Sequence, residues 1–361
     1  MFPQYLEGIT SILYIFVCML FLLLKIICFD KYNKWQLFGV LLAFGIGILT
    51  YIGSKDLTPF ILILLVVSAK DIDFDKILKV WLVVVISIML LAFAASMLDI
   101  IENLQYKAHF LDKTDSIRNS FGIVYPTDFG AHIFFIVVTA FYLKRNRLKW
   151  FDFLIALAVA GLLYYFCQAK LDSGSIVLAV LLFGIARAID CKGTYNLKKL
   201  WKSIWNTCGC LITPLMCGAT IVVTMAYKAG DAIDDIDNLG TIAARLRLGQ
   251  AAIKDYGIKP FGQKLDLIGA GGSTNHDWSK YNYIDASYIQ ILVCQGISYF
   301  ALIITTYIAI CIKHRRNIYL LCAVAMISLN CMIAHHMIAI EYNVFTLALL
   351  ALVDKTERND S

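Results

Sequence analysis

The chain has 361 residues, of which 60% are apolar and only 16% are charged, and its mean hydropathy is +0.73. Soluble domains carry about 25% charged residues. The composition therefore excludes a soluble enzyme, a disordered chain and a fibrous repeat, and it indicates a polytopic helical membrane protein. The formal net charge of +6 is what basic cytoplasmic loops produce, so we expect no nucleic-acid partner.

Apolar segments recur along the whole chain at the length that membrane helices require, which is about 20 residues. We predict an all-α protein that forms a single transmembrane domain over residues 1–361, with about eleven transmembrane helices. The third is short and contains Pro59. The predicted spans are 6–28, 35–53, 57–69, 77–98, 126–143, 150–168, 174–189, 204–227, 286–311, 318–335 and 340–353.

The short loops between these spans fall into two sets that differ in basic charge. One set carries 18 Lys and Arg, and the other carries 5. Because Lys and Arg stay preferentially in cytoplasmic loops, we place the first set in the cytoplasm, the N-terminus outside and the C-terminus inside. No basic segment precedes the first apolar run, so no cleaved signal peptide is expected.

The 11 cysteines form no CxxC pair and show no zinc-ligand spacing. We therefore predict neither a disulfide framework nor a metal site.

Residues 228–285 form one large extracytoplasmic loop, which we predict to contain short helices. The segment 241–256 has apolar residues near one face at helical spacing, Gly257 suits the helix end, and Pro260 follows. The glycines of 269–272 follow no strand and match no phosphate-loop spacing, so we interpret them as a flexible turn. Because this is the organised polar part of the chain, we expect chemistry at this membrane edge.

Arginines at this edge are candidate ligands for an anion. Arg245 and Arg247 are two positions apart on the predicted helix and so point about 200° apart, one toward a site and one toward solvent or lipid headgroups. Arginine suits phosphate because its fork binds two oxygens, although both residues could simply keep the loop soluble. Arg118 is either another such ligand or a membrane-edge anchor. After it, Pro126 suits the first turn of a helix that Thr127 or Asp128 can cap.

Candidate proton acceptors lie at three places. Asp285 begins the ninth predicted span, as a helix cap or as a general base. His335 and His336 lie between the last two spans; histidines there are costly in a bilayer without a purpose, although a short turn would expose them. His276 is a lone histidine in the large loop. None of these shows a metalloprotease spacing, and we predict no metal ion and no cofactor.

Four segments of the chain, taken together, resemble segments of the Wzy-type polysaccharide polymerases. These polymerases belong to the O-antigen ligase and polymerase superfamily. Each match is weak alone, but the four occur in order around one long outside loop. They are R-N-S-F-G…Y-P-T-D-F-G from Arg118, R-L-R-L-G…Y-G-I-K-P-F-G from Arg245, D-A-S-Y-I-Q-I-L…G-I from Asp285, and H-H…Y-N-V-F from His335.

The resemblance implies a GT-C-like integral membrane glycosyltransferase in the cytoplasmic membrane of a bacterium. Such polymerases join oligosaccharide repeat units, carried on undecaprenyl pyrophosphate, into a surface polysaccharide such as O-antigen, capsule or exopolysaccharide. Transfer is inverting and metal-independent. The implied partners are the lipid-linked donor and acceptor, the lipid bilayer and a chain-length regulator.

The resemblance also implies roles for residues. Arg245 and Arg118, with Arg247 nearby, would hold the pyrophosphate. Asp285 stands where the related ligases have a histidine base, so Asp285, His276 and the pair His335/His336 all remain candidates for the proton acceptor. Two other functions stay open: a ligase of the same fold, which the motifs barely separate from a polymerase, and a lipid-linked oligosaccharide flippase or transporter, which would need polar residues deep in several spans.

Overall fold

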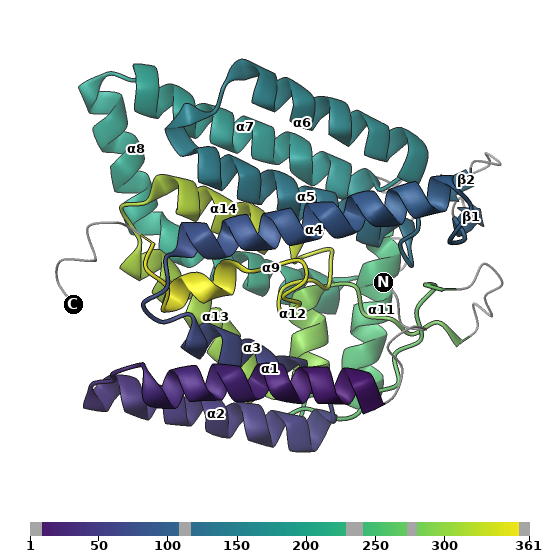
Figure 1. The fold of residues 1–361 in the computed structure, drawn as a ribbon. Coiled ribbons are helices and arrows are strands. Elements are labelled where there is room, and N and C mark those ends of the chain that lie inside the picture. The colour runs from purple at the N-terminus through teal and green to yellow at the C-terminus, as the bar shows by residue number, and fades with distance from the viewer. Residues whose placement is uncertain (1–8, 108–116, 229–240, 273–279, 354–361) are drawn as a thin grey trace.

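Helices dominate the structure, and they follow the apolar segments of the sequence (Figure 1). The computed structural model describes residues 9–107, 117–228, 241–272 and 280–353. Among these residues, seven helices are long and apolar enough to cross a membrane, and three shorter apolar helices accompany them. The predicted polytopic helical membrane protein is thereby confirmed.

The helices and strands follow one another along the chain with short connections. In chain order they are α1 (Ile9–Cys28), α2 (Lys34–Ser54), α3 (Thr58–Ser68), α4 (Phe74–Met97), β1 (Gln105–Lys107), β2 (Ile117–Asn119), α5 (Pro126–Lys144), α6 (Trp150–Leu162), α7 (Lys170–Lys192), α8 (Tyr195–Cys208), α9 (Ile212–Ala226), α11 (Thr241–Tyr256), α12 (Ser287–Gln290), α13 (Gly296–Lys313) and α14 (Ile318–Asn330). Short 3₁₀ or π turns η2 (Arg145–Arg147), η3 (Leu163–Cys167), η4 (Gly209–Leu211), η6 (Ile291–Gln295) and η7 (Phe345–Leu349) extend or follow them.

Burial separates an outer set of helices from an inner one. Only 17% of the apolar window of α2 and 22% of that of α4 are buried inside the protein, against 56% for the span that begins with α5 and 50% for the span Ser287–Lys313. Nearly every residue of α14 is buried, and this helix packs against α5, α7 and α9. The exposed apolar faces of α2 and α4 are suited to contact lipid, while α5, α7, α13 and α14 surround the protein core.

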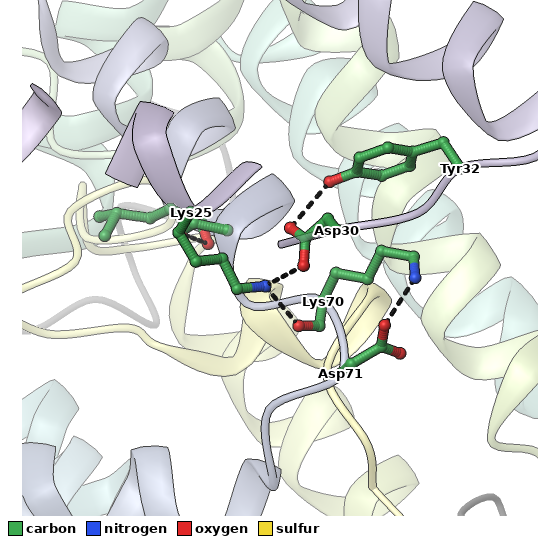
Figure 2. A network of polar contacts seen from close by, with 7 residues as sticks. Lys25, Asp30, Tyr32, Lys70 and Asp71 are labelled. Atoms are coloured by element: carbon green, nitrogen blue, oxygen red, sulfur yellow. Dashed lines mark hydrogen bonds and ion pairs between the residues drawn. The ribbon is translucent and has the colours of Figure 1, made fainter. Parts of the chain in front are cut away.

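Charged groups at one end of the outer helices neutralise one another (Figure 2). Lys25 Nζ at the end of α1 donates to Asp30 Oδ1 at 2.5 Å and to the carbonyl of Lys70 at 2.6 Å. Tyr32 donates its hydroxyl proton to Asp30, and Lys70 pairs with Asp71 at 2.6 Å. The network ties the end of α1 to the residues that follow α3.

The structure corrects the last two predicted spans. Helix α14 ends at Asn330 rather than at residue 335, and residues 340–353 contain no α-helix, only the short turn η7. Hydropathy reports burial rather than helicity, and Phe345 and Ala348 of this segment are buried in the protein core. Its end packs beside α4, where Leu352 exchanges backbone hydrogen bonds with Ile72 and Phe74. The other predicted spans coincide with helices.

Residues 331–344 form an irregular segment that is held by polar contacts. Its carbonyls and amides find partners, as non-helical backbone must when it lies inside a membrane protein. The backbone amide of Ser287 donates to the carbonyl of Cys331 at 3.0 Å, and its hydroxyl donates to that of Ala334 at 2.6 Å. The side chain of Asn343 donates to the carbonyl of Met337 at 2.8 Å. The segment is therefore fixed against the start of α12.

The helix predicted in the large loop is confirmed as α11, with the same bounds, 241–256. The next residue, Gly257, has a φ of +66°, and its amide donates to the carbonyl of Ile253. This left-handed conformation ends the helix at little cost only in glycine. Strands β1 and β2 form an antiparallel ribbon, in which Tyr106 pairs with Arg118.

Candidate functional site

Polar side chains from five distant segments gather where several apolar helices begin. Asp128 lies in the first turn of α5 and Asp172 in the first turn of α7. Asp285 precedes α12, Arg245 lies on α11, and His335 lies in the irregular segment after α14. Electrostatic coupling connects them: Asp128 interacts with Asp172 and Asp285, and Asp172 interacts with Arg245.

Arg245 is held inside this cluster. Its Nε donates to the carbonyl of Ile333 at 2.8 Å and lies 3.4 Å from Asp285 Oδ2. Only 16% of the Arg245 side chain and 23% of the Asp285 side chain are exposed. Asp285 is not the cap of α12, which begins after Ala286 without a side-chain cap. Of the two alternatives for Asp285, a cap and a functional carboxylate, the cap is thereby excluded.

Arg247 points elsewhere. It is exposed, whereas Arg245 on the same helix is largely buried. This difference in exposure agrees with the expected divergence around the helix, and Arg245 is the one of the pair that contacts Asp285.

Arg118 is almost fully buried, with 5% of its surface exposed. Its Nε donates to the carbonyl of Cys167 at 3.2 Å, its Nη1 donates to the Tyr125 hydroxyl at 3.4 Å, and the guanidinium lies 5.4 Å from the centre of the Tyr125 ring. Within the described residues it forms no ion pair, although it interacts electrostatically with Asp172. The Arg118 side chain therefore lies inside the protein and not at its surface.

The two adjacent histidines and Asp128 form the most compact group. One ligand atom from each of Asp128, His335 and His336 lies within 4.8 Å of the others. Tyr342 is stacked between the rings of His132 and His336, at 4.0 and 3.8 Å between ring centres. The ring of Tyr283 stands edge-on to His335 at 5.0 Å. The histidine rings are thus packed into the protein, not exposed in a turn.

Burial sets the protonation of this group. Desolvation lowers the pKa of His335 to about 4, although the carboxylate of Asp285 acts in the opposite direction. Burial likewise raises the pKa of Tyr281 and of Tyr283 above the ordinary value. At neutral pH, His335 is therefore a neutral imidazole that can accept a proton or another Lewis acid, and both tyrosines remain hydroxyl donors.

Sequence reasoning missed several members of this cluster. Thr127 or Asp128 was expected to cap α5, but the N-cap position is Tyr125 and no side chain caps the helix. Asp172, which accepts a hydrogen bond from Asn330 at 3.3 Å, and His132 were not singled out at all. The sequence contains a signal that could have identified both residues. Each is an ionisable group within two turns of the start of an apolar span, and ionisable groups inside a membrane are costly and usually functional.

Two other predictions concern the large loop. The amide of Gly272 lies 3.3 Å from the Val124 carbonyl and 3.1 Å from the Tyr106 hydroxyl. The glycines therefore dock the loop on the β1–β2 segment, and this amide is not free to bind a phosphate. His276 lies outside the described residues.

Comparisons of the chain with models of known protein families, with curated proteins and with solved structures found no match.

Proposed function

We propose that the chain is a polysaccharide polymerase that joins undecaprenyl-pyrophosphate-linked oligosaccharide repeat units at the outer face of a bacterial cytoplasmic membrane. The observation that supports this best is the placement of Arg245 between Asp285 and the carbonyl of Ile333. A cation and a carboxylate are thereby held side by side at the end of an apolar helical bundle. This is the pair of groups that a transfer from a lipid pyrophosphate requires.

The leaving group determines what the arginines do. When the bond between the anomeric carbon and the pyrophosphate oxygen breaks, negative charge grows on the lipid pyrophosphate. Arg245 and Arg118 are fixed by protein carbonyls, and both interact with Asp172, so their charges serve the same region. Cations that are positioned in advance stabilise such a leaving group without reorganisation. In this scheme a metal ion is not needed at the pyrophosphate, as the family resemblance implies.

The acceptor hydroxyl needs a general base that takes its proton. A hydroxyl of the incoming repeat unit attacks the anomeric carbon from the side opposite the pyrophosphate, which inverts the configuration, and its proton passes to a protein group. Asp285 is our first candidate, because it is partly exposed and adjoins Arg245. Buried His335 and His336 are the alternatives that the described residues contain, and His276 is the fourth candidate.

The decisive experiment is a deletion strain complemented with variants. A polymerase mutant displays single repeat units on its surface glycan where the wild type displays long chains. Repeat units trapped on their lipid carrier inside the membrane would instead identify a flippase, and full-length polymer left on its lipid carrier would identify a ligase. Either of these two results would overturn the proposal.

A further inference from the structure

The group Asp128, His335 and His336 has the geometry of an incomplete coordination shell. Its three ligand atoms lie within 4.8 Å of one another. Three ligand atoms that are placed evenly around one ion, each about 2.0–2.2 Å from it, are about 3.3–3.8 Å apart. Side-chain adjustments that bring these atoms roughly one ångström closer together, within rotamer freedom, would let all three contact one ion.

The donor types favour one class of ion. Two imidazoles and one carboxylate suit zinc and the other divalent first-row transition metals, and a set of three protein ligands leaves positions open for water or a substrate. Magnesium and calcium prefer shells made of oxygen alone. The spacing of the residues in the sequence gives no hint of this set, because Asp128 is about two hundred residues away from the two histidines.

One buried polar atom of the group lacks the partner that such atoms normally have. His336 is 2% exposed, and its Nδ1 has no hydrogen-bond partner within the described part of the chain. No side-chain hydrogen bond or ion pair to a described residue is formed by Asp128 either, although Asp172 and Asp285 place further negative charge nearby. Unsatisfied buried groups are costly and call for a bound ion or water. A cation would satisfy the imidazole and interact favourably with the Asp128 carboxylate.

The surroundings also hold the rings in place. Tyr342 is stacked on His336, and on its other face it contacts His132; Tyr283 contacts the edge of His335. The backbone of the segment is pinned by Ser287, whose hydroxyl accepts from the amide of Met337 at 3.2 Å and donates to Ala334. Metal sites depend on such a supporting shell to orient their ligands.

From these observations we propose that Asp128, His335 and His336 bind one divalent transition-metal ion, of the zinc and cobalt class, at the start of α5. This departs from the metal-free site expected on the sequence. It does not rest on the proposed transferase function, because binding of an ion is measured without any glycan. It has one consequence for that function: liganded histidines cannot serve as the base, which leaves Asp285 and His276.

The test uses the purified full chain in lipid nanodiscs, stripped with a chelator and then titrated with Co²⁺ or Zn²⁺. We expect one ion per chain by elemental analysis, and visible Co²⁺ absorption typical of nitrogen and oxygen ligands. The variants Asp128→Asn and His336→Gln should each weaken binding at least about tenfold. Glu341→Gln is the matched control, because it removes an exposed carboxylate from the same segment.

A second pair of measurements keeps the result decisive if one variant misfolds. His335→Gln tests the third ligand independently, and size-exclusion profiles and unfolding temperatures of the metal-free proteins verify that each variant is folded. Failure of the wild type to retain an ion, or equal retention by all three ligand variants and the control, would overturn the proposal. An Arg245→Ala variant that makes no polymer but binds the ion normally would show that the two proposals stand separately.

Discussion

Arg245 and Asp285, forty residues apart in the chain, are in contact at 3.4 Å between Nε and Oδ2. The first lies on α11 and the second just before α12. The same Arg245 nitrogen also donates to the carbonyl of Ile333. One side chain thus connects the large loop, the start of α12 and the irregular segment that carries the two histidines.

Replacement of Arg245 should abolish polymer. We expect Arg245→Ala to lower polymer formation by about 10²–10³-fold, as loss of one preorganised donor to developing charge does. Arg245→Lys should recover only part of this, because lysine is a point charge without a fork. The readout is surface glycan length in the deletion strain. Lys254→Ala removes an exposed cation from the same helix and serves as control; wild-type chain length in Arg245→Ala would refute the role of this residue.

Asp285→Asn tests the base. The amide keeps the size of the side chain but cannot accept a proton from the acceptor hydroxyl, so we expect a loss of about 10²–10⁴-fold, the usual contribution of general base catalysis. Polymer formed from purified lipid-linked repeat units is the measurement. If Asp285→Asn retained activity while His276→Ala lost it, Asp285 would be excluded as the base and His276 would replace it.

The Ser287 hydroxyl should stabilise the irregular segment. Ser287→Ala leaves the carbonyl of Ala334 and the amide of Met337 without this partner, and loss of such a buried group costs about 1–3 kcal/mol. We expect a lower unfolding temperature in detergent. Thr305→Ala is the control, because the exposed Thr305 hydroxyl bonds only within its own helix. Equal unfolding temperatures for the two variants would contradict the prediction.

The proposed orientation can be tested by labelling. Lys264 is 67% exposed, so Lys264→Cys should react with a membrane-impermeant thiol reagent on intact cells. The unmodified chain is the background control. Of its exposed cysteines in the described residues, Cys28 and Cys191 lie at the ends of helices that we assign to the cytoplasmic side, and Cys208 lies within the predicted span 204–227. Lys199→Cys should react only after lysis. The reverse pattern of labelling would invert the topology.

Local patterns predicted much of the fold. The helix 241–256 followed from its apolar spacing and from Gly257, and the opposite directions of Arg245 and Arg247 followed from helical geometry alone. The segment 340–353 was predicted wrongly for an equally local reason. Its hydropathy indicates burial, but whether a buried segment is helical depends on the partners of its backbone, such as Asn343 with Met337 and Leu352 with Ile72.

The amino-acid sequence by itself determined that this is a polytopic membrane protein, where most of its helices lie and which polar loop carries candidate arginines. Apolar length and helical periodicity are properties of neighbouring residues. Only the tertiary structure decided that Asp128 meets His335 and His336, and that Asp285 pairs with Arg245 instead of capping α12. Those contacts depend on how α5, α11 and α14 pack, and packing joins side chains whose separation along the chain carries no local signal.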